Sequence, residues 1–458
     1  MPFIILFIGI CVLLSNQPVL MTVALMSYVI IGRLFWREGE PKVLFFGITL
    51  FWLSISIKLF YAIYNGVPYE SLSNAANIVD TTYSALIAFI VYGTGLYITT
   101  QKARRNAVLS FKNDYGYSSR RLLYVYGGSI LAMSVVKGSF GLIKGLDQIV
   151  FSLIDLKLGF IFVALYAVYV RRDSLPFAIA LISVEIILSF FSFFSGFKDI
   201  LFAMLIVLMA PKIKLGFKSI VSYSIVAFAA LYLLFSWQFI KGEYRAFLNK
   251  GTNSQSVEVS QGEALDKLQE LAMADKKEEE KEKIIYTSID RLSYIEFYSE
   301  SRMKVPAFMP YENGKIWAGN LAHIFLPRMF FPDKEAIDDS KMVNKYCFRK
   351  VLTAKSGVSM SLGFVAESYI DFGPVFMYVI IFLVGCFMGI IYSAILRQSI
   401  NLFWGYTMVL PLFIKINCNG TPGTKILGWM ITYYVAFWLF KRFLMGRLET
   451  YLKTGVFK

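Results

Sequence analysis

Two carboxylic acids four residues apart are the first candidates for chemistry in this sequence. Glu367 and Asp371 lie in the stretch 363–373, directly before Pro374 opens a long apolar segment. Residues four apart face the same side of a helix, so the two carboxylates would lie together at a membrane surface. Carboxylates in that position act as a general base or orient a hydroxyl group. The alternative is an acidic first turn that stabilises the start of the next helix.

A second group combines arginine with tyrosine. Its members share one face of a predicted helix because they follow one another at intervals of three, four and four residues: Arg291, Tyr294, Tyr298 and Arg302. The two guanidinium groups would stand about 16 Å apart at 1.5 Å per residue. Arginine presents a planar fork of donors that suits phosphate oxygens, so the pair would serve two phosphate groups rather than one. The alternative is an interfacial amphipathic helix whose arginines extend towards water.

Three further polar positions stand out beside apolar segments. Arg245 follows an aromatic stretch just past one such segment, where an interface anchor is the alternative to an anion ligand. Lys198 and Asp199 lie at a break between apolar segments, where charges facing lipid are costly, so we expect them to line a cavity. His323 is the only histidine and stands in an apolar context, which also favours a structural role.

These residues need a scaffold, and the composition indicates a helical membrane protein. The chain has 458 residues, of which 57% are hydrophobic and 17% aromatic, and its mean hydropathy is +0.58. Runs of about 20 apolar residues cross a bilayer as helices, because lipid offers no partner for open backbone groups. The sequence therefore predicts an all-α polytopic protein with about 12 transmembrane helices, at residues 2–15, 19–36, 43–64, 81–100, 122–140, 149–170, 175–194, 199–211, 219–240, 374–396, 402–417 and 425–445.

Lysine and arginine sort between the two predicted sides. All four basic clusters fall on one side, which the positive-inside rule assigns to the cytoplasm together with both termini. These clusters lie at 102–121, 171–172, 212–218 and 441–447. The insert 241–373 holds 19 Lys/Arg and 20 Asp/Glu, so the formal charge of +15 comes from short loops. The charge is therefore no signal for nucleic-acid binding.

The chain divides into three predicted parts: a bundle of about nine spans at 1–240, a periplasmic insert at 241–373, and a hairpin with a last span and cytoplasmic tail at 374–458. In the insert, the polar stretch Lys250–Lys283 is predicted to be a mobile surface element. It would contain a loose linker and then one helix, Glu263–Lys283. The rest of the insert mixes aromatic, proline and arginine residues with apolar ones. We expect it to fold on the outer membrane face and to carry the active site.

Several functional classes are excluded by what the sequence lacks. It has no phosphate-binding loop, dinucleotide fingerprint, zinc-protease motif, nucleophile elbow or nucleic-acid module. The cysteines and the single histidine have no metal-ligand spacing, so we expect no metal site and no cofactor. Cys347 and Cys418 both fall on the predicted outer side, where they are either two free thiols or a disulfide.

The second half of the chain, residues 190–396, resembles the Wzy-type oligosaccharide repeat-unit polymerases, also called O-antigen polymerases. The resemblance lies in the order of the spans, in one long periplasmic loop late in the chain, and in short motifs. The motifs are Ser195-Gly196-Phe197-Lys198, Trp237 to Arg245, Leu326-Pro327-Arg328, Phe331-Pro332-Asp333-Lys334, and Gly363 to Gly373. This chain departs from the family at Lys198, where arginine is common; lysine keeps the charge but loses the planar fork.

The resemblance implies a metal-independent glycosyltransferase of the GT-C type in the bacterial inner membrane. Its substrates would be undecaprenyl-diphosphate-linked oligosaccharides, and a chain-length regulator and a flippase would be its partners. The implied catalytic residues are Glu367, Asp371, Arg328 and His323. The implied diphosphate-binding residues are Arg245, Arg291, Arg302, Lys198 and Lys334. Tyr244, Tyr294, Tyr298 and Tyr369 would contact substrate.

Three other functions compete with a polymerase. A glycan ligase of the same superfamily would use the same chemistry. A flippase or transporter would carry charges through many spans or show inverted repeats, whereas spans before residue 185 carry few charges. A membrane scaffold would not need so many arginines and carboxylates in the insert.

Overall fold

The computed structural model describes most of the chain, and every regular element in the described part is a helix. The description covers residues 2–457 except 106–114, 139–146, 172–174, 191–195, 211–231, 234–235, 253–256, 275–277, 327–330, 332–336, 352–359 and 417–419. Because no strand occurs in these ranges, the predicted all-α class is confirmed for them.

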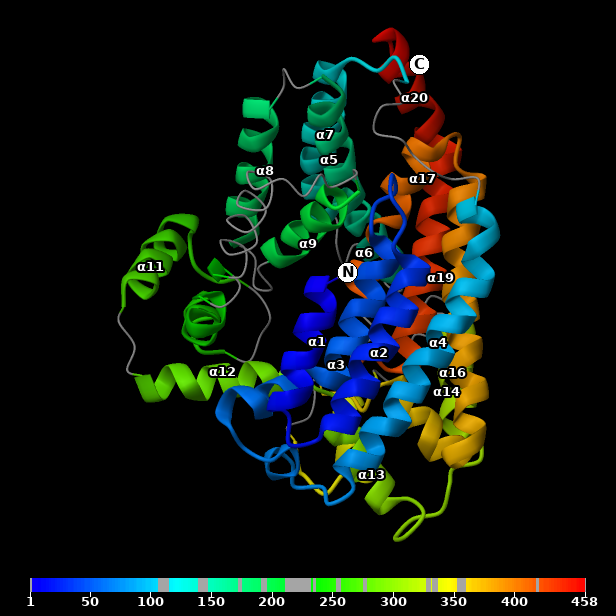
Figure 1. Cartoon of the computed structure of the whole chain (residues 1–458). Helices are drawn as coiled ribbons and strands as arrows, with labels where there is room; N and C mark the ends of the chain where they lie inside the picture. Colours follow the sequence, from blue (N-terminus) through cyan, green and yellow to red (C-terminus); the bar gives the residue numbers. More distant parts are fainter. Residues whose placement is uncertain are drawn as a thin grey trace.

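The helices form an upright bundle with shorter helices packed at its lower end (Figure 1). Those of the first half are α1 Pro2–Leu14, α2 Pro18–Phe35, α3 Val43–Asn65, α4 Ile78–Arg105, α5 Ser119–Gly138, α6 Asp147–Asp155, α7 Lys157–Arg171, α8 Leu175–Phe190 and α9 Phe197–Leu208. Residues 236–248 are also helical. The second half contains α11 Gln261–Met273, α12 Glu278–Leu292, α13 Ile295–Lys304, α14 Lys315–Phe325, α15 Asp339–Tyr346, α16 Phe364–Gln398, α17 Leu402–Val409, α18 Leu412–Lys415, α19 Gly423–Phe440 and α20 Gly446–Thr454.

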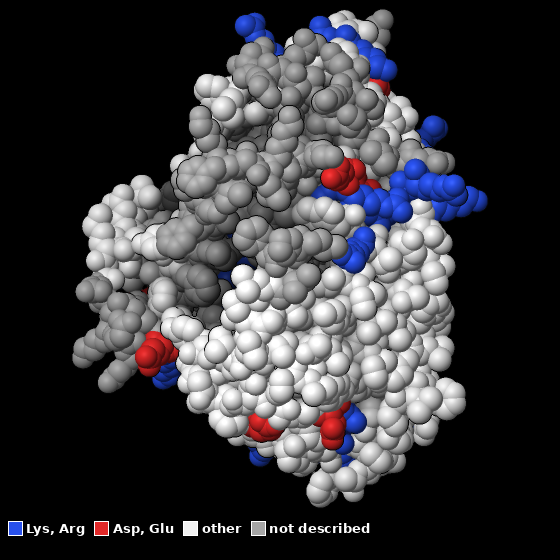
Figure 2. Space-filling view, viewed as in Figure 1, with Lys and Arg blue, Asp and Glu red and all other residues white. Residues whose placement is uncertain are grey.

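Five helical stretches in the described part are long and apolar enough to cross a membrane. They are Pro18–Phe35, Val43–Asn65, Ile78–Arg105, Gln148–Val168 and Phe364–Gln398. Figure 2 shows a broad uncharged surface over α1, α2 and α4, with mostly basic side chains above it and charged side chains of both signs below. The predicted span 219–240 lies largely outside the described residues. The transmembrane character of the chain therefore rests on these five stretches.

The seam between α4 and α16 holds the bundle together. A Cβ atom added at Gly95 would lie 2.5 Å from the carbonyl oxygen of Phe382, and one at Gly385 would collide with the carbonyl oxygen of Tyr92. The hydroxyl of Ser393 donates a hydrogen bond to the Thr99 oxygen at 2.8 Å. Close backbone approach at small residues is the usual way for helices to pack in lipid, where apolar burial by itself gives no preference for helix contacts.

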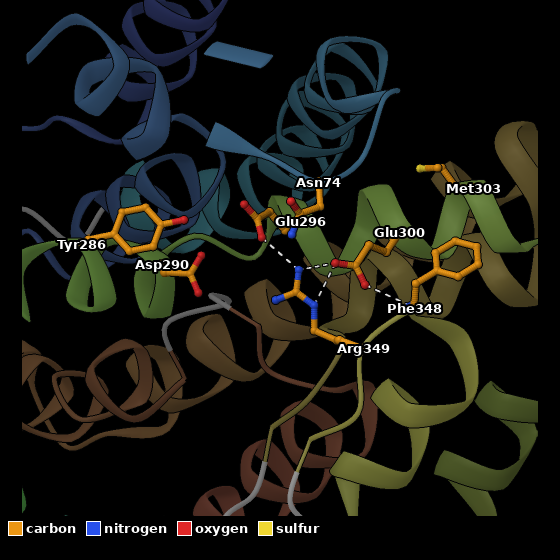
Figure 3. A pocket seen from close by; sticks show the side chains of 8 residues that line it. All are labelled: Asn74, Tyr286, Asp290, Glu296, Glu300, Met303, Phe348 and Arg349. Atoms are coloured by element: carbon orange, nitrogen blue, oxygen red, sulfur yellow. Dashed lines mark hydrogen bonds and ion pairs between the residues drawn. The ribbon is translucent and has the colours of Figure 1, made fainter. Parts of the chain in front are cut away.

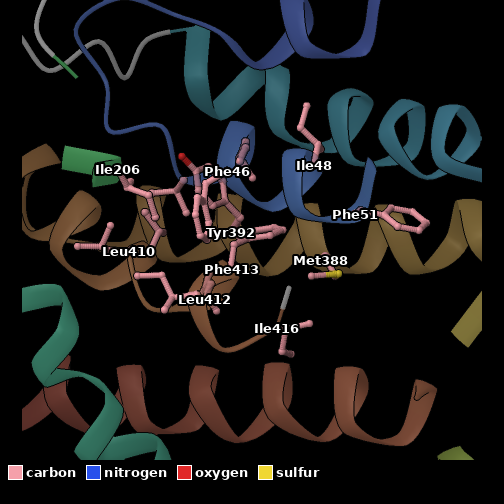
Figure 4. Close-up of a cluster of buried hydrophobic side chains, with 14 of the residues drawn as sticks. Phe46, Ile48, Phe51, Ile206, Met388, Tyr392, Leu410, Leu412, Phe413 and Ile416 are labelled. Carbon is pink, nitrogen blue, oxygen red and sulfur yellow. The ribbon is translucent and has the colours of Figure 1, made fainter. Parts of the chain in front are cut away.

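A second packed region fills the space between α3, α9, α16 and the α17–α18 connection (Figure 4). Phe413 fits against Gly47 of α3, where any side chain would overlap its ring. The rings of Phe413 and Tyr392 lie 6.5 Å apart, edge to face. This core joins the helices that follow the insert to the helices that precede it.

Several buried charges in the described part of the bundle form ion pairs. Arg104 is fully buried and binds Glu40, with 3.0 Å between its Nε and Oε1. Lys415 binds Asp155 at 3.0 Å and Asp199 at 2.9 Å. Lys198 and Asp199, which were both predicted to line a cavity, have different surroundings: Asp199 is held in an ion pair, whereas Lys198 is exposed.

The first part of the insert differs from the prediction of one surface helix. Two helices, α11 and α12, replace it, and a capping box starts α11: the Glu263 amide donates to the Ser260 hydroxyl at 3.3 Å. Ala264 and Leu271 of α11 are buried in a small apolar cluster with Tyr244. The prediction of a mobile surface element did not anticipate this packing, because two small or aliphatic residues seven apart suffice to dock a short helix.

Candidate functional site

Four cations from three distant segments gather on the side of the bundle that carries α9 and α12 (Figure 1). We call them the basic cluster: Lys198, Lys241, Arg245 and Arg291. Three of the four were predicted to bind diphosphate. Lys198 and Arg291 are exposed, and the other two are half-buried, so the cluster is open to a ligand.

Aromatic packing brings these segments together. The ring of Phe197, at the start of α9, lies 5.7 Å from the ring of Trp237 in an edge-to-face contact. Trp237 contacts Tyr244 in the same way, at 5.7 Å. Lys198 follows Phe197 directly and Arg245 follows Tyr244 directly. The packed rings of Phe197 and Tyr244 therefore fix the backbone positions from which Lys198 and Arg245 extend.

The electrostatics of the basic cluster are those of crowded like charges. Burial, together with the charges of Arg291, Arg245 and Lys198, lowers the pKa of Lys241 to about 8. Burial also lowers the pKa of Arg245, and Arg291 adds to this effect. Positive charges that depress one another's pKa favour a bound anion, which would relieve the repulsion.

Arg302 stands apart from the basic cluster. The predicted continuous helix is wrong, because α12 ends at Leu292 and α13 begins at Ile295. The backbone amide of Tyr294 leaves the helix to donate to the Ser54 oxygen of α3 at 3.2 Å. Arg291 and Arg302 therefore share no helical face. A contact with a distant helix decided this break, which spacing in the sequence could not reveal.

Arg302 instead lies between two tyrosine rings. Its guanidinium carbon is 5.8 Å from the ring centre of Tyr298 and 5.8 Å from that of Tyr369. Its Nη1 donates to the hydroxyl of Thr81 at 3.2 Å. Arginine over aromatic faces is held by cation–π attraction. The contacts join α13, α16 and α4.

Of the four tyrosines predicted to contact substrate, three are buried and one adjoins the basic cluster. The hydroxyl of Tyr244 is buried and donates to the Phe190 oxygen at 3.1 Å. The hydroxyl of Tyr369 donates to the Val305 oxygen at 2.9 Å, and that of Tyr298 bonds Ser84 at 2.7 Å. All three lie in packed surroundings.

Tyr294 is the tyrosine that adjoins the basic cluster. It is half-buried, and its burial raises its pKa. The negative charge of Asp339 raises that pKa further, while the positive charge of Arg291 lowers it. The phenol thus lies between a cation of the basic cluster and a carboxylate. Asp339 forms an ion pair with Lys425, at the N-terminal end of α19.

The two predicted catalytic carboxylates lie on a short helical segment that ends at Gly373. This glycine has φ +71°, and its backbone turns against the ring of Tyr311, 3.3 Å from where a Cβ would lie. Pro374 then opens the long apolar part of α16. The kink separates Glu367 and Asp371 from the long, mainly apolar part of α16.

Both carboxylates are buried and bind the first amides of other helices. Asp371 accepts from the Ile316 amide at 3.1 Å and the Trp317 amide at 2.8 Å, at the start of α14. Glu367 accepts from the Gly423 amide at 2.8 Å, at the start of α19. A carboxylate at a helix N-terminus satisfies free amides and the helix dipole. The sequence alternative was that these acids stabilise the start of the next helix, whereas the helix starts that they bind are those of α14 and α19, distant in the sequence.

The double contact of Asp371 predicts a stability effect. Asp371→Ala should lower the free energy of unfolding by about 0.5–2 kcal/mol, because two amides of α14 lose their acceptor. Asp371→Asn keeps an oxygen acceptor and should lose less. The measurement is thermal unfolding of purified protein in detergent, with Asp266→Ala, on the exposed face of α11, as the control. Equal midpoints for wild type and Asp371→Ala would contradict the capping role.

The remaining predicted residues do not join the basic cluster in the described part of the chain. His323 is half-buried in the last turn of α14. Arg328 and Lys334 lie outside the described residues, as does Cys418. Cys347 is a free thiol whose Sγ lies 3.6 Å from the Phe297 oxygen. Among the described residues, no group of three or more His, Cys, Asp or Glu is arranged to hold a metal ion.

Sequence reasoning missed Lys241 and Asp339. The sequence could have indicated Lys241, because it lies four residues before Arg245 and so shares its helical face. Asp339 had none, because it meets Lys425 and the Tyr294 region only through the folding of α15 against the bundle.

The matches to known proteins are few. A family model described as Domain of unknown function (DUF8712) matches residues 47–415. This range runs from α3 to the end of α18 and includes the whole basic cluster, both carboxylates and Tyr294. No curated protein and no solved structure matches the chain.

Proposed function

The chain belongs to the DUF8712 family, and we propose that it is a metal-independent glycosyltransferase that polymerises undecaprenyl-diphosphate-linked oligosaccharide repeat units. The product would be a surface polysaccharide such as an O-antigen, capsule or exopolysaccharide. The reaction would take place at the periplasmic face of the bacterial inner membrane.

The observation that carries this proposal is the basic cluster. Breaking the glycosidic bond of a diphosphate-linked sugar leaves a lipid diphosphate, on which negative charge develops in the transition state. Fixed cations aimed at such a charge stabilise it without further reorganisation. Lys198, Lys241, Arg245 and Arg291 supply four cations, two of them half-buried, where screening by water is weaker.

The topology that we propose places this cluster outside the cytoplasm. About 12 spans of a GT-C-like arrangement would carry the insert 241–373 in the periplasm and both termini in the cytoplasm. The sorting of lysine and arginine supports this orientation. The lower-end helices α12 and α13 and the C-terminal α20 lie at opposite ends of the molecule in Figure 1, which agrees with it.

Within the site, Tyr294 marks the boundary between donor and acceptor. The diphosphate would lie on the Arg291 side of the phenol, and the acceptor hydroxyl on the Asp339 side, with Glu367 close to that carboxylate. Asp371 would act as a helix cap rather than as a base, because both of its oxygens accept backbone amides. Arg302, Arg328, Lys334 and His323 remain predicted participants without a placed contact to the cluster.

A deletion strain tests the proposal. Deleting the gene should leave lipid-linked glycan at a single repeat unit, and the wild-type gene should restore the ladder. Purified protein with lipid-linked repeat units should form polymer in the presence of EDTA. A normal ladder in the deletion strain would refute polymerisation. Long chains that stay on the lipid carrier would instead identify a ligase, and abolition by EDTA would refute metal independence.

A further inference from the structure

A pocket of about 550 Å³ opens at the lower end of the bundle, between α12, α13 and the segment after α15. Its volume lies in the range of small-molecule sites. In Figure 3 the ring of Tyr286 lies at one end of the pocket and that of Phe348 at the other, with charged side chains between them. Tyr286 is 40% exposed and Phe348 is 55% exposed, so part of each ring is accessible to a ligand.

The charged side chains between the rings are held firmly. The Nη2 atom of Arg349 donates to Glu296 at 2.9 Å, and its Nε donates to Glu300 at 2.8 Å. The second oxygen of Glu300 accepts the Phe348 amide at 3.1 Å. These bonds fix the guanidinium and one of the two rings, so the pocket is already organised without a ligand.

Asp290 provides the accessible acceptor. Its Oδ1 binds the buried amine of Lys58 at 2.8 Å, and its side chain is 36% exposed. In Figure 3 its carboxylate and the guanidinium of Arg349 face the same space, with Asn74 across from them. The carboxylate accepts hydrogen bonds, the guanidinium donates them, and the side-chain amide can do either. Rings of sugars need this combination, because each hydroxyl donates and accepts while the C–H faces stack on aromatic rings.

The balance of charge limits which sugar fits. Three carboxylates and one cation, Arg349, line the pocket. Two further cations adjoin it: Lys58 is buried behind the carboxylates, and the amine of Lys304 lies 5.5 Å from the ring centre of Phe348. The side chains of the lining therefore carry a negative excess, in contrast to the basic cluster. A sugar that bears a carboxylate would meet like charge, which costs affinity.

The pocket adjoins the basic cluster along the chain. Asp290 lines the pocket, and Arg291, the next residue of α12, belongs to the cluster. We propose that this pocket binds an uncharged sugar ring of the lipid-linked glycan, while the basic cluster binds the diphosphate of the same class of substrate. The inference rests on the proposed function for the kind of ligand, and the pocket selects against acidic sugars.

Saturation-transfer NMR on the full-length protein in lipid nanodiscs tests this. The probes are glucose, galactose, N-acetylglucosamine, glucuronic acid and spermidine, each added alone. At least one of the uncharged sugars should receive saturation, and glucuronic acid should not. The double variant Tyr286→Ala/Asp290→Asn should weaken that sugar's binding about tenfold or more, because it loses a stacking face and a charged acceptor. The control, Tyr124→Ala/Asp266→Asn, changes exposed residues on α5 and α11 and should bind normally.

The outcomes separate this inference from the proposed function. No transfer to any uncharged sugar, equal transfer in the double variant, or equal transfer to glucuronic acid would overturn the sugar site. Saturation of spermidine alone would identify an amine site instead. The NMR experiment can show sugar binding that depends on the pocket while the deletion strain still makes a normal glycan ladder. That combination would support the sugar site and refute the polymerase.

Discussion

Arg245→Lys and Arg291→Lys should each lower the rate of polymer formation by about 10²-fold or more. A fixed donor on a developing oxyanion contributes about 3–4 kcal/mol, and a loss of about 2.7 kcal/mol is a hundredfold in rate. Lysine keeps the charge at both positions but cannot reproduce the planar fork that binds two phosphate oxygens at once. An interface anchor would tolerate the same change, because it needs only a charged tip.

The measurement is polymer formation in vitro with purified protein and lipid-linked repeat units. Arg447→Lys, at an exposed arginine of α20, is the matched control and should be fully active. Near-normal chains from both cluster variants would refute the role of the cluster.

Repulsion within the basic cluster predicts a second, separate effect. Lys241→Gln should not lower the midpoint of thermal unfolding, because it removes one cation from a group of like charges.

The state of Lys241 also makes anion binding dependent on pH. Its pKa of about 8 means that it is charged at lower pH and loses its proton as the pH rises through that value. Binding of inorganic pyrophosphate by calorimetry should therefore weaken across this range in the wild type. Lys241→Gln should bind more weakly at low pH and lose this part of the dependence.

Arg104→Met should lower the free energy of unfolding by about 3–5 kcal/mol. The guanidinium is fully buried and binds Glu40, and its Nη2 also donates to the Phe35 oxygen at 3.0 Å. Removing it leaves the Glu40 carboxylate buried without its paired guanidinium, with the Tyr406 hydroxyl at 3.3 Å and only the more distant charge of Lys42. Breaking a buried pair costs this much because the remaining charge is uncompensated.

Thermal unfolding in detergent measures the effect, and the next residue supplies the control. Arg105 is exposed at the end of the same helix, so Arg105→Met should change the midpoint little. Glu40→Gln/Arg104→Met removes both charges and should recover much of the loss. A double variant as unstable as Arg104→Met would show that the guanidinium contributes through packing rather than through its partner.

The length of the apolar runs determined the class of this protein without any structure, whereas the sorting of lysine and arginine predicted its orientation. A membrane helix forms its backbone hydrogen bonds within itself, so a single contiguous apolar segment is enough to predict it. Val43–Asn65 and Ile78–Arg105 are examples. Three of the four cations of the site could also be named in advance, from their positions next to apolar segments or in the insert. Arg245, Arg291 and Lys198 were found in this way.

Which of these side chains meet was decided by tertiary contacts. The amide of Tyr294 bonds to α3 and ends the helix that would have placed Arg291 and Arg302 on one face. Glu367 and Asp371 share a face as their spacing requires, yet the amides they bind belong to α19 and α14, far away in the sequence. Spacing specifies neighbours within one helix, whereas the partner of a buried charge depends on which other helix end is packed against it. The basic cluster likewise exists because aromatic contacts between Phe197, Trp237 and Tyr244 bring three segments together.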